Sequence, residues 1–183
     1  MRLIHTVPLA AAILLAGCGG DADTNEDGEV SGAEAAAEAA GAVQPQPGQY
    51  RTAFELLEFN VPGAPEALRQ QLQAKMGGAA EVAKPIVSCL TPEQAGANGA
   101  EQMVKNMTGN DCTIARFDVS GGTLSAETQC PGPNGTTSHS VLDGQMTATS
   151  STMTMTTETE MQGLGKVQMK VRVNSERVGD CPA

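Results

Sequence analysis

The acidic stretch DTNEDGEVSGAE, from Asp23 to Glu34, has the residue types and spacing of a calcium-binding loop. A loop of this kind, about twelve residues long, places oxygen ligands at fixed positions, needs a glycine at its sharp turn and ends on a bidentate glutamate. Gly28 stands at the turn, and the candidate ligands are Asp23, Asn25, Asp27, Glu29, Ser31 and Glu34. The chemistry to expect is weak binding of Ca²⁺, with a Kd of roughly 10⁻⁴–10⁻³ M.

The loop resembles that of an EF-hand, but the rest of that motif is missing. The residues CGGDA, from Cys18 to Ala22, stand where an entering helix would lie. Val30 has the position that usually contacts a partner loop, and the sequence contains no second loop of this kind. A solvated acidic tether is therefore our first interpretation of the segment, and calcium binding is the alternative.

Residues 1–17 have the composition of a bacterial export signal. A short basic start precedes the apolar run VPLAAAILLA, which is too short to span a bilayer. The sequence LAGC, Leu15 to Cys18, resembles the lipobox of bacterial lipoproteins. This resemblance implies cleavage before Cys18, a diacylglycerol on its sulfur and an acyl chain such as palmitate on its amino group, which together anchor a protein stably. Because Gly19 is not an aspartate, we expect an outer-membrane lipoprotein that faces the periplasm.

Charge divides the expected mature chain into a tether and a domain. The whole chain carries a formal net charge of −10, and every charged side chain from Cys18 to Gly48 is acidic. The sequence GAVQPQPG that ends this segment has the composition of a linker. We therefore expect a largely disordered tether over residues 18–48 and one globular domain over residues 49–183. Without a basic patch, nucleic acid is not an expected partner; the membrane, through the lipid, and an envelope protein are.

An even number of cysteines remains after the lipid cysteine, which in an exported chain indicates disulfides. The segment from Cys112 to Cys130 has two strand-like runs around the sequence SGG, which predicts a hairpin with a three-residue loop centred on Gly121. That register places the two cysteines opposite one another, where their Cβ atoms lie close enough for a bridge. Cys89 is then left to pair with Cys181. Free thiols acting as nucleophiles or metal ligands are the alternative.

The first half of the domain predicts one strand and two helical segments. Gln49–Val61 has a partly broken strand alternation, and Pro65–Gly78 then places apolar residues at helical spacing with two glycines at its end. A second helix begins at Thr91, where Pro92 fits the first turn and Gln94 can close a capping box. The sequence GANG predicts an interruption of this helix.

The last two strands have the clearest alternation of the chain. Pairing them about Gly163 places apolar side chains on one face and opposite charges on the other. The resulting pairs are Met153 with Val173, Met155 with Val171, and Glu160 with Lys166. We therefore expect an α+β fold, with a curved antiparallel sheet, barrel-like if its edges meet, one or two packed helices and disulfide staples.

Several short sequences occur in an order that resembles a known family. They are GQYR at the start of the domain, CLTPEQA in its middle and RVGDC at its end, with two further cysteines around a hairpin. Together they resemble domain of unknown function 3617, a family of exported bacterial proteins, many of which carry a lipoprotein signal. The resemblance covers roughly Gly48 to Cys181. It implies no established activity and no catalytic residues.

Other chemistries have little support in the sequence. The methionines could offer thioethers to Cu(I), but the strand pattern places Met153 and Met155 among valines, where methionine fills a core. His139 is the only histidine after the expected signal, and one histidine cannot serve both a metal site and a general base. The chain lacks the G-x-S-x-G nucleophile motif. We expect no catalytic site, and no cofactor other than weakly bound Ca²⁺.

Three functions are compatible with these residues. The first is a lipid-anchored envelope protein whose stapled domain is a binding or structural module. The second is a calcium-binding lipoprotein that uses the 23–34 loop. The third is an envelope enzyme, which would need a cleft with convergent polar groups. No exposed motif in the sequence identifies a ligand.

Overall fold

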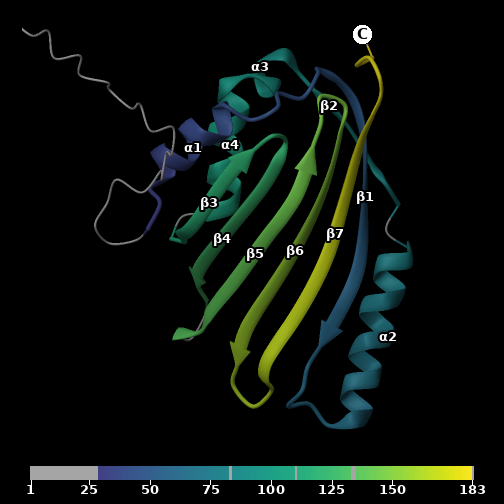
Figure 1. Ribbon diagram of the computed structural model, residues 1–183. Helices are drawn as coiled ribbons and strands as arrows, with labels where there is room; N and C mark the ends of the chain where they lie inside the picture. Colours follow the sequence, from purple (N-terminus) through teal and green to yellow (C-terminus); the bar gives the residue numbers. More distant parts are fainter. Residues whose placement is uncertain (1–28, 83, 110, 133–134, 183) are drawn as a thin grey trace, which may run out of the picture.

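The structure, a computed structural model, describes residues 29–182 except for 83, 110, 133 and 134. Its centre is a seven-stranded antiparallel sheet with the strand order β2-β1-β7-β6-β5-β4-β3. The strands are β1 (Gly48–Asn60), β2 (Ile86–Leu90), β3 (Thr113–Ser120), β4 (Thr123–Pro131), β5 (Thr137–Met146), β6 (Ser150–Met161) and β7 (Gly165–Gly179). The helices are α1 (Gly32–Ala40), α2 (Glu66–Val82), α3 (Pro92–Ala95) and α4 (Ala97–Thr108). This arrangement confirms the expected α+β fold, although the curved sheet stays open and does not close into a barrel (Figure 1).

The hairpin of β6 and β7 has the register that the sequence predicts. The observed pairs include Glu160 with Lys166, Met153 with Val173, and Met155 with Val171. Strand β1 pairs with the other side of β7, so the last strand of the chain lies inside the sheet between β1 and β6. The apolar face of this hairpin therefore continues onto a third strand.

The β3–β4 hairpin brings its two cysteines together by a different route from the expected one. Its loop is the two-residue turn Gly121–Gly122, and not a three-residue loop. Both glycines have positive φ, 57° and 84°, as the type I′ turn of a tight hairpin requires. A β-bulge between Ile114 and Arg116 then shifts the register back by one residue. Cys112 consequently bonds to Cys130, as predicted.

The segment from Val30 to Ala40 packs on the domain, within the range expected to form the tether. Val30 forms a single bridge with Ile114 on β3, and α1 follows directly. Ala35 and Ala39 on this helix are buried in the main core, against α4 and β3. Part of the segment expected to be a largely disordered tether is thus a packed helix, because the alanine face of α1 is small enough to pack closely on α4.

The main core lies at the β3–β4 end of the sheet, between it and the pair α1 and α4. Its buried members are Ala35, Ala39, Val104, Ile114, Phe117, Leu124 and Ala126. Most of these side chains are small, so this core is thin. The strands farther along the sheet carry mostly half-buried apolar side chains.

The other helices follow the sequence signals with one exception. Helix α2 starts one residue after Pro65 as predicted, but it continues to Val82 through the glycine pair at which we expected its end. Helix α3 has the predicted capping box, because Thr91 Oγ1 accepts from the Gln94 backbone N–H and Gln94 Oε1 accepts from that of Thr91. Gly96 separates α3 from α4, which confirms the predicted interruption.

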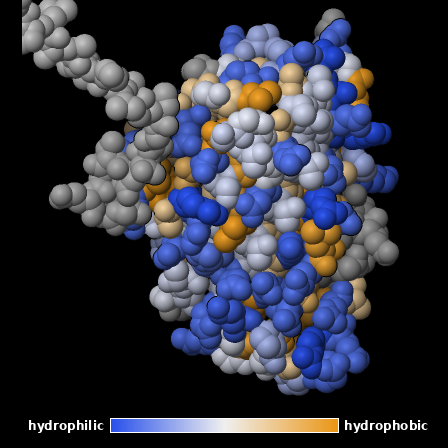
Figure 2. All heavy atoms as spheres, in the orientation of Figure 1, coloured by the Kyte–Doolittle hydropathy of each residue, from blue (hydrophilic) through white to orange (hydrophobic). Residues whose placement is uncertain are grey.

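The surface on the side turned to the viewer in Figure 2 is largely hydrophilic, with only scattered apolar side chains. Exposed ion pairs on strands, such as Arg172 with Glu55 and Lys166 with Glu158, contribute to the polar surface of the sheet. Pairs of this kind favour solubility more than stability. In the described part of the chain, no helix is long and apolar enough to cross a membrane.

Candidate ligand-binding groove

A groove of about 940 Å³ lies between helices α3 and α4 and one face of the sheet. Its floor comes from six neighbouring strands, β4, β5, β6, β7, β1 and β2, and its other wall comes from the two helices. The volume lies near the top of the roughly 300–1,000 Å³ that is usual for small-molecule sites. The groove is therefore large enough for a ligand and extends across most of the sheet.

Strand alternation explains how this floor forms. Side chains two residues apart on a strand share a face, and so do directly paired residues on neighbouring strands. Ala126, Leu142 and Met155 pair in succession across β4, β5 and β6. The same row continues to Val171 on β7 and Leu56 on β1, so one continuous apolar row crosses five strands.

The helix wall adds two more apolar side chains. Met103 and Met107 lie four residues apart on α4, which places them on the same helix face over the sheet. Both pack against the main core while also lining the groove. Methionine is flexible and polarisable, so this wall can adapt to ligands of different shape.

Four polar side chains of the groove are hydrogen-bonded to one another in two pairs. Thr52 and Ser175 share a hydrogen bond of 3.0 Å between hydroxyl oxygens across β1 and β7. Gln102 donates to Asn106 Oδ1 at 3.0 Å along α4. Because these four groups already have hydrogen-bond partners, a ligand does not have to supply partners for them. Glu93 on α3 is the one charged side chain among the described residues that line the groove.

Apolar side chains on the same sheet face remain exposed beside the groove. Phe54 is 42% exposed and shares the face of Thr52, two residues before it on β1. Ile86, which pairs with Thr52, is 56% exposed at the β2 edge. Met155, within the groove itself, is 38% exposed. The open apolar surface thus extends past the walls of the groove toward β1 and β2.

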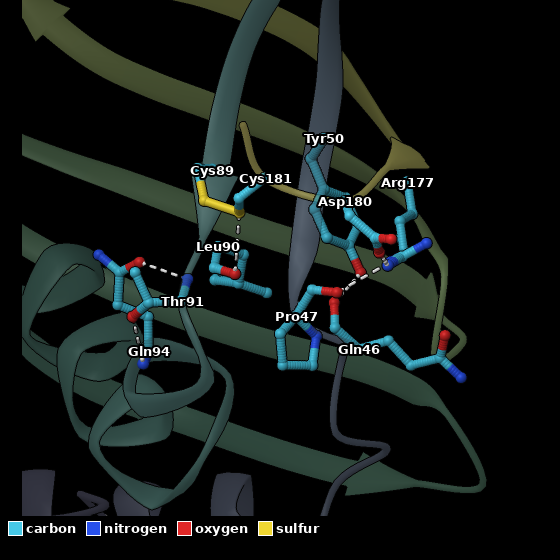
Figure 3. The surroundings of a disulfide bond; sticks show 10 residues. All are labelled: Gln46, Pro47, Tyr50, Cys89, Leu90, Thr91, Gln94, Arg177, Asp180 and Cys181. Atoms are coloured by element: carbon cyan, nitrogen blue, oxygen red, sulfur yellow. Dashed lines mark hydrogen bonds and ion pairs between the residues drawn. A yellow bond between two sulfur atoms is a disulfide. The ribbon is translucent and has the colours of Figure 1, made fainter. Parts of the chain in front are cut away.

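A disulfide and a polar cluster lie at the β2 end of this region (Figure 3). Cys89 on β2 bonds to Cys181, with their Cα atoms 5.5 Å apart, and this ties the C-terminal segment to the strand. Arg177 Nε donates to the Pro47 carbonyl at 2.9 Å, and its guanidinium also binds the carboxylate of Asp180. The disulfide and these bonds together hold the C-terminal segment against the start of the sheet.

Tyr50 fastens the segment before β1 to the β5–β6 loop. Its hydroxyl donates to the Gln46 carbonyl at 2.8 Å and lies 3.2 Å from the Ala148 carbonyl, and the residue is only 8% exposed. Burial raises the pKa of Tyr50, and the nearby positive charge of Arg177 opposes that shift without cancelling it. A phenol placed in this way is a structural anchor at the end of the groove.

We expect the stability of the protein to fall at alkaline pH because of Tyr50. Since the folded pKa lies above the unfolded one, the unfolded state loses its proton first. The contribution is therefore intact below about pH 10 and is lost as the pH rises through the folded pKa. Tyr50 is the single tyrosine, so its phenolate absorbance gives that pKa directly.

Tyr50→Phe should cost about 1 kcal/mol of unfolding free energy at neutral pH. Urea unfolding should then show that the variant loses less stability at alkaline pH than the unsubstituted protein does. An equal loss in both would mean that other groups cause it.

The structure tests the predicted site residues unevenly. Both expected disulfides are present, Cys112–Cys130 with Cα atoms 4.1 Å apart and Cys89–Cys181. Cys18, the predicted lipid site, and Asp23, Asn25 and Asp27, the first calcium ligands, lie outside the described residues. Lipidation and calcium binding therefore stay predictions.

The described end of the acidic loop acts as a helix cap. Ser31 is the N-cap of α1, and its side chain accepts from the Glu34 backbone N–H at 3.2 Å. The Glu34 carboxylate accepts from the Ser31 backbone N–H at 2.9 Å, which completes a capping box. The glutamate expected to close a calcium site is thus engaged in starting α1, and Glu29 lies just before the bridge at Val30.

Other chemistry-bearing side chains of the described chain do not form a centre. Within these residues, no group of three or more His, Cys, Asp or Glu side chains is placed to hold a metal ion. His139 Nε2 lies 2.7 Å from Glu127 Oε1, a half-exposed pair on neighbouring strands. Met153 and Met155 lie on the apolar face opposite the valines, as predicted, and Met161 is exposed near the β6–β7 turn.

Comparisons with known proteins agree with the resemblance found in the sequence. The sequence profile of a family described as "Protein of unknown function (DUF3617)" matches residues 45–181. The comparisons with curated proteins and with solved structures returned no match. The matched range includes all seven strands, the helices α2, α3 and α4, and both disulfides.

Proposed function

The chain belongs to the DUF3617 family, and from that premise we propose that it is a lipid-anchored binding module of the cell envelope whose groove holds an elongated apolar ligand. The observation that carries the proposal is the groove between α3, α4 and the sheet. It combines a row of apolar side chains on its floor, adaptable methionines on its helix wall and two pairs of polar side chains that are already bonded to one another. A largely preformed apolar site of this kind is the usual form of a small-molecule binding site.

The remaining features of the chain fit the same proposal. A lipid at Cys18 would keep the domain close to a membrane, which is the main source of apolar molecules in the envelope. Two disulfides suit an oxidising compartment and compensate for the thin core. The described groove residues offer no nucleophile beside a general base, so we propose binding and not catalysis.

Placing a charge in the floor of the groove should weaken this binding. The variant is Met155→Lys, made in the chain from Gly19 to Ala183, and the ligand is the neutral dye N-phenyl-1-naphthylamine. We expect the dye to bind about tenfold more weakly or worse, because it would have to desolvate the new ammonium group. The increase in dye fluorescence on binding measures the Kd.

The matched control is Met161→Lys, because Met161 lies on the same strand and is 44% exposed but does not line the groove. It should leave the Kd of the dye unchanged. Urea unfolding of both variants checks that each is folded. Loss of dye binding in both variants, or in neither, would contradict a site at the groove.

A further inference from the structure

The shape of the groove defines the class of molecule that it can hold, given the proposed binding function. Six strands contribute to its floor, which corresponds to five steps between neighbours. At about 4.8 Å per step, the floor is roughly 24 Å long. One leaflet of the roughly 30 Å hydrocarbon core of a bilayer is about 15 Å thick. The floor is therefore long enough for a single acyl chain with a polar head group at one end.

The two ends of the groove differ in charge. At the β4–β5 end, every described lining side chain is uncharged, the apolar ones being Ala126, Leu142, Met103 and Met107 and the others Thr128, Cys130 and Ser140. At the β2 end, the lining includes Ser88 and Leu90 on the edge strand and the carboxylate of Glu93 on the helix that follows. An acyl tail would be desolvated at the first end, and a polar head group would meet both water and hydrogen-bonding partners at the second.

The hydrogen bonds that a bound peptide would need argue against a peptide as the occupant of the groove. An extended peptide carries a donor and an acceptor on nearly every residue, and each needs a partner once buried. The hydroxyls of Thr52 and Ser175 bond to one another, and Ser140 bonds to Thr157 at 3.0 Å. The Tyr50 hydroxyl is likewise committed to backbone carbonyls. A hydrocarbon chain makes no such demand on the floor.

Charge selects among head groups. Glu93 is the one charged side chain among the described lining residues, and the chain as a whole carries −10. Arg177 lies near the Tyr50 end but does not line the groove, and its guanidinium is bound by the Pro47 carbonyl and the Asp180 carboxylate. An anionic head group would thus approach a carboxylate without a free cation to neutralise it.

We infer that the ligand is a single-chain amphiphile whose head group carries no negative charge, bound with its acyl tail toward β4 and β5 and its head group beside Glu93. Free fatty acids and single-chain phosphates share the tail but carry the wrong charge. Cationic amphiphiles have the tail and a charge that Glu93 accepts.

A competition series tests this class directly. Monolaurin, laurate and dodecylamine carry similar chains on a neutral, an anionic and a cationic head group. Each is titrated, below the concentration at which it forms micelles, against dye bound to the Gly19–Ala183 chain at neutral pH. We expect monolaurin and dodecylamine to displace the dye at least tenfold more effectively than laurate.

Glu93→Gln isolates the reason for the selectivity. Removing its charge should improve displacement by laurate about fivefold, as expected for a nearby charge in a watery site, and should leave monolaurin within twofold. The matched control is Glu101→Gln, because Glu101 lies on α4, pairs with Lys105 at 2.6 Å and does not line the groove. It should leave all three ligands unchanged.

The outcomes separate the two proposals. Failure of the dye to bind would overturn the proposed function itself. Dye binding with displacement by laurate as strong as by monolaurin would overturn the inference about the head group and leave the groove intact. Dye binding without displacement by any of the three would overturn the assignment of a single-chain amphiphile. An unchanged laurate affinity in Glu93→Gln would overturn the role of Glu93.

Discussion

Replacing Cys89 and Cys181 together by serine is expected to lower the free energy of unfolding by about 4.6 kcal/mol, the value that the chain-entropy relation gives for a loop of this length. The two cysteines are 92 residues apart, so their bridge removes much freedom from the unfolded chain. In the folded chain, they tie the C-terminal segment to β2, which pairs with β1 over only five residues. Because the core is thin, few other contacts hold this edge. Urea unfolding at neutral pH measures the loss.

The second disulfide provides the matched control. Replacing Cys112 and Cys130 together should cost about 3.2 kcal/mol by the same relation, since only 18 residues separate them within one hairpin. The bond between Cys89 and Cys181 should therefore be the more important one by about 1.4 kcal/mol. Equal losses, or a larger loss for the hairpin bridge, would show that native contacts and not loop length determine the contribution.

The sequence predicts those parts of the fold whose signals are local. The β6–β7 register follows from alternation alone, because a slip of one residue would turn Met153 and Met155 away from the valines. The capping box at Thr91 is equally local, since its two bonds join residues three positions apart. In both cases one short stretch contains the whole signal, whereas the glycine pair of α2, a local signal too, did not end that helix.

The β3–β4 hairpin shows a correct prediction reached through two errors that cancel. The three-residue loop was wrong, and so was the assumption of an unbroken ladder. The bulge between Ile114 and Arg116 adds one residue to β3, which restores the pairing of the cysteines. Alternation in a short strand cannot reveal a bulge, because a bulge depends on how the twisted strand meets its partner.

The groove could not be predicted, because it depends on contacts far apart in the chain. Its lining joins β2 and β4, which lie at different parts of the sheet, and α4 above them. The sequence signal was present in Met155 and in the serines and threonines at alternate strand positions, but these residues fit an ordinary half-buried sheet equally well. Only the sheet curvature and the position of α4 distinguish a groove from a filled core. The packing of α1 could not be predicted for a similar reason, since a run of alanines fits a free helix as well as a packed one.

Placing a carboxylate on the buried face of α1 should separate this helix from the domain. We expect Ala35→Glu to lower the free energy of unfolding by roughly 3 kcal/mol or more. Ala35 is 0% exposed, and a carboxylate buried at this position would be an unpaired charge. A helix of nine residues is not stable alone, so α1 should melt when it leaves the core. Amide hydrogen exchange should then show lost protection over α1 before the sheet opens, and urea unfolding should show the reduced stability.

Ala37→Glu is the matched control, because Ala37 lies on the exposed face of the same helix and the substitution changes helix propensity and net charge equally. It should change stability by no more than about 0.5 kcal/mol. Since α1 packs on α4, and α4 forms one wall of the groove, the buried substitution should also weaken dye binding while the exposed one does not. Equal behaviour of the two variants would mean that α1 is not part of the folded domain in solution. A loss of stability in Ala35→Glu with unchanged dye binding would mean that the groove does not depend on α1 to hold α4 in place.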